Sequence, residues 1–155
     1  MGIGATNNTI LPATRSQLED WMIAQCYNFN SYSVNGSIIH EGYGIDKADD
    51  GFVWYYTERG QKSHLKYFQT EKEIVQYAFE ALKNDKWART HCIGFTGDKK
   101  EALELAEKLK LLRITFIQDE IPFYGWDKPA FRTFVLGCDH KLVNDLKEQY
   151  NKAPW

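Results

Sequence analysis

Aromatic and β-branched residues alternate with polar ones through residues 52–68, FVWYYTERGQKSHLKYF. Two runs of this kind flank Arg59-Gly60, which predicts a β-hairpin with its turn at these two residues. The expected register pairs Thr57 with Lys62, Trp54 with Leu65, and Phe52 with Tyr67. One face of this hairpin is then apolar, and helices from elsewhere in the chain are needed to cover it.

Four stretches have apolar residues at helical spacing after a residue that can cap a helix. The expected caps are Ser16 with Glu19, Thr70 with Glu73, Asp98 with Glu101, and Asp139. The apolar stripes are Leu18, Trp21, Met22 and Cys26; Ile74, Val75, Ala78, Phe79 and Leu82; Ala102, Leu105, Ala106 and Leu109; and Leu142, Val143, Leu146 and Tyr150. These stripes predict four helices that can pack on a sheet.

Further strands are expected around the central hairpin. Asn35-Gly36 favours a second hairpin that pairs residues 32–34 with residues 37–41, because both turn residues tolerate positive φ. Residues 91–95 and 113–118 are expected to form strands. Residues 130–138 have apolar side chains on both faces and predict a central strand.

The pattern as a whole predicts the α+β class, in a single domain with a largely antiparallel sheet and helices packed against it. Residues 1–13 are expected to form a loose N-terminal arm, residues 14–150 the domain, and residues 151–155 a C-terminal tail. Hydrophobic residues make up 43% of the chain and charged residues 26%, a composition typical of globular rather than disordered proteins.

Charge and cysteine content restrict the compartment and the partners. A net charge of -2 argues against a surface that attracts nucleic acid everywhere, and no apolar run approaches the length of a membrane span. No signal-peptide pattern opens the sequence, so a cytoplasmic location is expected. Cys26, Cys92 and Cys138 are widely separated and odd in number, which predicts reduced thiols.

No sequence motif for catalysis, a cofactor or a metal is present. The Walker glycine loop, the GxSxG elbow and the HExxH zinc helix are all missing, so no cofactor and no metal are expected. The acidic positions Asp46, Asp49 and Asp50 lack the ligand spacing of an EF-hand calcium loop and indicate a solvated turn. A small metal-independent hydrolase or nuclease stays open as the alternative function, with the histidine pair His64 and His91 as its acid and base.

The segment 119–129, DEIPFYGWDKP, combines large aromatic residues with carboxylates and two prolines. Aromatic side chains supply buried area at protein interfaces, and carboxylates attract a basic partner. The predicted partner-binding residues are Asp119, Glu120, Tyr124, Trp126 and Asp127, with Asp49 and Asp50 as a second, weaker group. The alternative is that Ile121, Phe123 and Trp126 tuck under the edge of the sheet.

Three motifs give the chain a resemblance to a known group of proteins. They are FVWYYTERG, FQTEKEIVQYAF, and the run from IPFYGW to FRTFVLGCD. Across residues 42–146, the chain resembles the immunity proteins of bacterial polymorphic-toxin and contact-dependent growth inhibition systems. The resemblance implies a non-enzymatic cytoplasmic protein that is monomeric before it binds its partner. It implies that the partner is a cognate toxin domain, often a nuclease, whose active site is covered in the complex.

Overall fold

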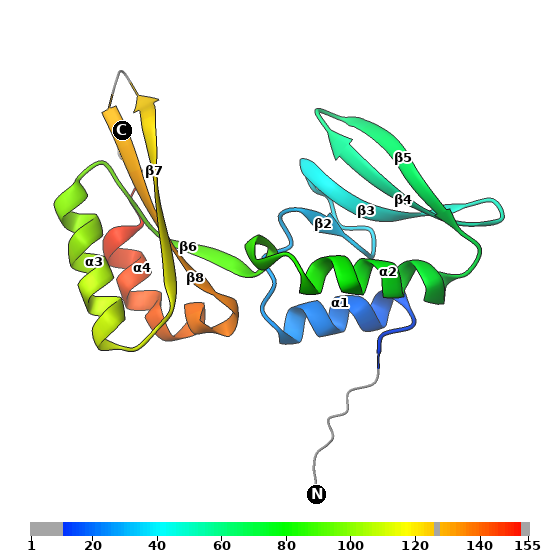
Figure 1. Cartoon of the computed structure of the whole chain (residues 1–155), viewed down its shortest axis with the longest axis horizontal. Coiled ribbons are helices and arrows are strands. Elements are labelled where there is room, and N and C mark those ends of the chain that lie inside the picture. The colour runs from blue at the N-terminus through cyan, green and yellow to red at the C-terminus, as the bar shows by residue number, and fades with distance from the viewer. Residues whose placement is uncertain (1–10, 126–127, 153–155) are drawn as a thin grey trace, which may run out of the picture. The chain divides into compact units, whose positions relative to one another are not determined.

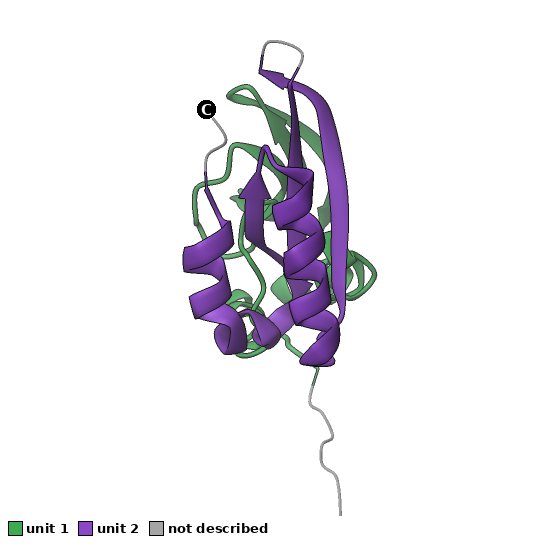
Figure 2. Cartoon of the chain, turned by 90° about the vertical axis from the view of Figure 1, so that its left-hand side faces the viewer, with its two compact units in different colours: residues 1–88 green, residues 89–155 purple. Residues whose placement is uncertain are grey.

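The computed structural model describes residues 11–125 and 128–152 of the chain. The chain divides into two compact units, Met1–Ala88 and Arg89–Trp155, which Figure 2 colours green and purple. Each unit has its own sheet and its own helices, and most strand pairs are antiparallel. The α+β class is confirmed, with two sheets where the sequence predicted one.

The first unit has a four-stranded sheet in the order β2-β3-β4-β5. Its elements are α1 (Arg15–Ala24), β2 (Tyr32–Ser33), β3 (Glu41–Ala48), β4 (Gly51–Glu58), β5 (Gln61–Phe68) and α2 (Glu71–Lys83), followed by the short helix η1 (Lys86–Arg89). Helix α2 packs against β4 and β5, and α1 packs against α2, so that both helices lie on the same side of the sheet (Figure 1). The β2–β3 pair is parallel and the others are antiparallel.

The helix starts of the first unit follow the sequence closely. Thr70 and Glu73 form the predicted capping box at the start of α2, and the whole predicted apolar stripe of this helix is buried. At α1 the cap is Thr14, whose side chain accepts from the Gln17 amide, and not Ser16. Both residues can cap a helix, and only the backbone geometry decides between them.

The central hairpin forms at Arg59-Gly60 with Thr57 opposite Lys62, as predicted, but its register then shifts. A bulge between Trp54 and Tyr55 places Trp54 opposite Lys66 and Phe52 opposite Phe68. Leu65 is therefore 53% exposed, and the predicted pairing of Trp54 with Leu65 is wrong. A bulge inserts one residue into one strand, which moves every later partner by one position.

The predicted hairpin at Asn35-Gly36 is also wrong. Tyr32 and Ser33 pair in parallel with Tyr43 and Gly44 of β3, and residues 37–39 are not in a strand. The Ser33 hydroxyl donates to the carbonyl of Ser37 at 2.5 Å, so the chain still turns here. The turn after Ser33 forms within a few residues, whereas the strand that pairs with Tyr32 and Ser33 begins only at Glu41.

The second unit has a three-stranded antiparallel sheet in the order β6-β8-β7. Its elements are β6 (Thr90–Thr96), α3 (Lys99–Leu111), β7 (Phe116–Gly125), β8 (Lys128–Leu136), η2 (Gly137–Val143) and α4 (Asn144–Tyr150). Strand β8 is central, as the sequence predicted. Helices α3 and α4 contact each other and pack on β6, around a core that includes Ile93, Leu105 and Val135 (Figure 1).

Asn151 and Lys152, the last described residues, are bonded to the second sheet. Asn151 forms a parallel bridge with Phe95, its amide side chain donates to the carbonyl of Cys92 at 3.1 Å, and the Lys152 amide donates to the carbonyl of Phe95 at 2.8 Å. In the described part of the chain, every helix lacks the combination of length and apolar composition that crossing a bilayer requires.

Cys92 is a free cysteine, as predicted. The Cys92 thiol donates to the carbonyl of Gly94 at 3.3 Å, and burial raises the pKa of this thiol.

Candidate functional site

The segment predicted as a loop at residues 119–129 is largely a β-hairpin of the second unit. Strand β7 continues to Gly125, and its regular pairing with β8 runs as far as Ile121 opposite Ala130. An irregularity follows, which includes Pro122, and pairing resumes at Gly125 opposite Lys128. This continuation was not predicted because a proline within a run argues against a strand. An edge strand such as β7 nevertheless accommodates a proline.

The side chains around this irregularity are exposed aromatic residues. Phe123 is 75% exposed and Tyr124 is 43% exposed. The Tyr124 ring meets Phe95 edge to face at a centroid distance of 5.2 Å, which holds it on the sheet. The alternative in which Phe123 tucks under the sheet edge is wrong, and a role of Tyr124 in partner binding stays a prediction.

The two carboxylates of the predicted site differ from each other. Asp119 lies opposite Arg132 and accepts from Nε at 2.9 Å and from a terminal guanidinium nitrogen at 2.5 Å. Glu120 is exposed and has no ion pair among the described residues. Asp119 is thus already neutralised by its own unit, and Glu120 is the carboxylate that can meet a basic partner.

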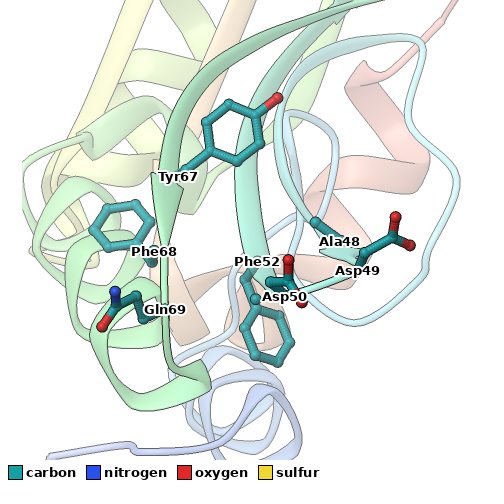
Figure 3. Close-up of a pocket in the computed structure, with 8 residues that line it drawn as sticks. Ala48, Asp49, Asp50, Phe52, Tyr67, Phe68 and Gln69 are labelled. Carbon is teal, nitrogen blue, oxygen red and sulfur yellow. The ribbon is translucent and has the colours of Figure 1, made fainter.

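Trp126 and Asp127, which complete the predicted set, lie outside the described residues. Asp49 and Asp50 belong to the first unit, at the turn between β3 and β4. They line a hollow of about 450 Å³ with Phe52, Tyr67 and Phe68, and Figure 3 shows the aspartates and Phe68 on opposite sides of it. Both carboxylates are exposed, whereas the Phe52 ring already faces the ammonium of Lys47 at 4.9 Å.

A second acidic and aromatic surface, which the sequence analysis missed, lies on β3 and β4. Glu41 is opposite Glu58, and Tyr43 is opposite Tyr56. The signal was the alternation Glu41, Tyr43, Ile45, which has the period of a strand. Glycines disfavour strands, so Gly42 and Gly44 weaken this signal.

The two histidines proposed for the alternative enzyme belong to different units. His64 lies on β5 of the first unit, with its Nδ1 3.2 Å from the Tyr67 hydroxyl, and His91 lies on β6 of the second. The imidazole next to His91 is that of His140, stacked at 4.0 Å between centroids and inclined by 26°. Rings stacked at this distance leave no room between them for a reacting group.

Within residues 11–125 and 128–152, no three histidine, cysteine or acidic side chains gather as metal ligands. Asp46, one of the positions weighed for calcium, accepts instead from the ammonium of Lys62 at 2.8 Å. Comparison with known protein families, with curated proteins and with solved structures finds no match to this chain.

Proposed function

We propose that this protein is an immunity protein, which binds a cognate toxin domain inside the producing cell and neutralises it by covering its active site. The observation that carries the proposal is the β7–β8 hairpin, which exposes the rings of Phe123 and Tyr124 and the carboxylate of Glu120 to solvent. Exposed large aromatic residues are typical anchors of protein interfaces, and an unpaired carboxylate attracts a basic surface.

The hairpin suits this task because its shape is fixed before binding. Strand β8 is paired on both sides, and the bidentate Asp119–Arg132 pair joins β7 to β8 next to the exposed residues. A surface that is already ordered loses little conformational entropy on binding, which favours a tight complex. A toxin with a cationic substrate groove, such as a nuclease, matches the acidic and aromatic character of the hairpin.

The proposal makes the protein an inhibitor without catalytic activity that acts as one copy per toxin. The resemblance in the three motifs and the exposed side chains of the hairpin both support it. Cytoplasmic action is part of the proposal, because an immunity protein must meet its toxin in the cell that makes both.

The proposal expects a secreted toxin-bearing protein to be encoded by the gene immediately upstream, and the test is co-expression with the C-terminal domain of that gene's product. The expected result is a one-to-one complex on co-purification and the rescue of cells that express that domain. A second arm replaces Phe123 and Glu120 together with alanine, which should abolish rescue while the variant stays folded. Full rescue by this variant, or the absence of any complex with the neighbouring domain, would overturn the proposal.

A further inference from the structure

The first unit carries a second surface that the proposed function does not use. We name it the Glu–Tyr patch, and it consists of Glu41 and Tyr43 on β3 and of Tyr56 and Glu58 on β4. Since residues two apart on a strand share a face, the opposed glutamates and the opposed tyrosines lie on the same face. The next pair on this face is Ile45 with Trp54, which belongs to the core.

The patch therefore runs from the buried core to solvent. Ile45 and Trp54 are each 4% exposed, Tyr43 is 37% exposed, and both glutamates are exposed. The Tyr43 ring lies nearly parallel to the Trp54 ring, at 5.7 Å between centroids and 9°, and 5.1 Å from the Tyr56 ring. The buried Trp54 ring thus packs against Tyr43, which in turn packs against Tyr56. The helices do not cover the two tyrosine rings completely.

The charges of the patch are not balanced within the unit. Glu41 and Glu58 have no ion pair among the described residues, although like charges directly opposite each other on two strands are destabilising. Burial raises the pKa of Tyr56, and the charges of Glu41 and Glu58 raise this pKa further. Arg59 follows Glu58 and lines a hollow of about 430 Å³ with Tyr56, but it forms no ion pair with either glutamate.

Elsewhere on the same face, a lysine of the chain already contacts aromatic rings. Lys66 is opposite Trp54, and its ammonium lies 4.9 Å from the Tyr77 centroid and 5.3 Å from the Phe68 centroid. The rings on that side of Trp54 thus already have a cation. Within the described residues, Tyr43 and Tyr56 have none, and they have two carboxylates beside them.

We propose that the Glu–Tyr patch is a docking site for an arginine side chain of a basic partner protein. A guanidinium can stack on a tyrosine ring while its N–H groups donate to carboxylates in its plane, and the patch offers both. An ammonium is a compact, strongly hydrated charge and cannot do both as well. The site uses residues of the first unit alone, and the inference does not depend on the toxin-binding role of the β7–β8 hairpin.

The test uses nona-arginine as the probe and nona-lysine as its control, titrated into the full chain at 0.1 M salt. Binding is followed through the NMR signals of the tyrosine rings and by calorimetry. The expected result is saturable binding that shifts the Tyr43 and Tyr56 signals, with nona-lysine at least 5-fold weaker. Shifts confined to other residues, equal affinity for both peptides, or saturation of the patch by Ca²⁺ instead would overturn the inference.

A matched pair of variants separates the patch from general electrostatic attraction. E41Q/E58Q and D20N/E148Q each remove two negative charges, so each changes the net charge from -2 to 0, and Asp20 and Glu148 are exposed residues outside both proposed binding surfaces. The first should weaken nona-arginine binding at least 10-fold, and the second by less than 2-fold. Equal losses of affinity in the two variants would show non-specific attraction and would contradict the inference. The E41Q and E58Q single variants should each lose an intermediate amount, and circular dichroism checks that all of them fold.

Discussion

Asp119 and Arg132 lie opposite each other on β7 and β8 and are joined by two hydrogen bonds of 2.9 and 2.5 Å. Both side chains are about one-third exposed, at 34% and 35%, so water screens the attraction. D119N should lower the free energy of unfolding by about 1 kcal/mol or less, because the guanidinium loses its charged partner. Chemical denaturation measures this change.

Glu120 is the matched control for Asp119, since it is exposed and has no ion pair among the described residues. E120Q should leave stability within about 0.5 kcal/mol of the original protein and weaken the toxin complex. D119N should do the opposite, and leave affinity nearly unchanged. A D119N variant that keeps its stability but loses affinity would show that Asp119 itself contributes to the proposed interface.

Phe123 is the most exposed aromatic residue of the β7–β8 hairpin, at 75%. F123A should weaken the toxin complex by about 2 kcal/mol, roughly 30-fold in Kd, because it removes an anchor of the interface. L111A, at a position 83% exposed on α3, is the control and should change neither affinity nor stability. Calorimetric titration of the toxin domain compares the two, and equal affinities would exclude Phe123 from the interface.

Glu41 and Glu58 face each other with like charges, and removal of either charge should stabilise the first unit. E41Q and E58Q should each raise the free energy of unfolding by roughly 0.2–1 kcal/mol. The double variant should gain less than the sum, since the first substitution already removes the repulsion. A loss of stability in the single variants would mean that the carboxylates have a stabilising role.

Arg59 has a φ of 53° and Gly60 a φ of 78°, so both residues of the central turn are in the left-handed region. An L-residue is strained there, asparagine less than arginine, and R59N should stabilise the hairpin by about 0.5–1 kcal/mol. G60A should destabilise it by about 1 kcal/mol for the same reason. Denaturation midpoints measure both, and a loss of stability in R59N would show that the guanidinium stabilises the turn more than its strain costs.

His140 stacks on His91, and burial lowers the pKa of His140 below its ordinary value of 6.5. The positive charges of His91, Lys141 and Lys147 lower this pKa further. The unfolded chain therefore takes up a proton at a higher pH than the folded chain does. The contribution of neutral His140 to the free energy of unfolding is fully present above pH 6.5. It decreases as the pH falls from 6.5 toward the pKa of His140 in the folded protein.

H140Q should remove this dependence, because glutamine does not titrate in the same range. The measurement is the free energy of unfolding at pH 8, 6 and 5, beside an NMR titration of the His140 ring in the original protein. H91Q should raise the pKa of His140 toward its ordinary value, since one neighbouring charge is lost. An identical pH dependence in H140Q and the original protein would contradict the assignment.

Local signals in the sequence predicted the helices better than the sheets. Thr70 with Glu73 makes a capping box within four residues of chain, and the apolar stripe that follows needs no distant partner to be recognised. The central position of β8 was predicted for a similar reason, because apolar residues on both faces of one strand already indicate burial on both sides.

Two errors are local. Thr14 and not Ser16 caps α1. Asp139 lies within η2 and does not cap α4, so that Leu142 is 70% exposed.

The other errors concern relations between distant segments. The turn at Arg59-Gly60 was predicted. The bulge beside Trp54 was not, because it depends on how two strands fit together and no single residue in the sequence indicates it. The extension of β7 through Pro122 depends on its place at the end of the sheet. The Glu–Tyr patch was missed because opposed residues on β3 and β4 become neighbours only once the register is known.

The position of Pro122 has a consequence for the uncomplexed protein. An exposed aromatic strand at the end of a sheet is normally a template on which further copies can add strand by strand. Proline has no N–H to donate, and the pairing of β7 is irregular between Ile121 and Gly125, where the exposed rings are. The chain can therefore display Phe123 and Tyr124 to solvent while this stretch of backbone discourages the addition of further strands.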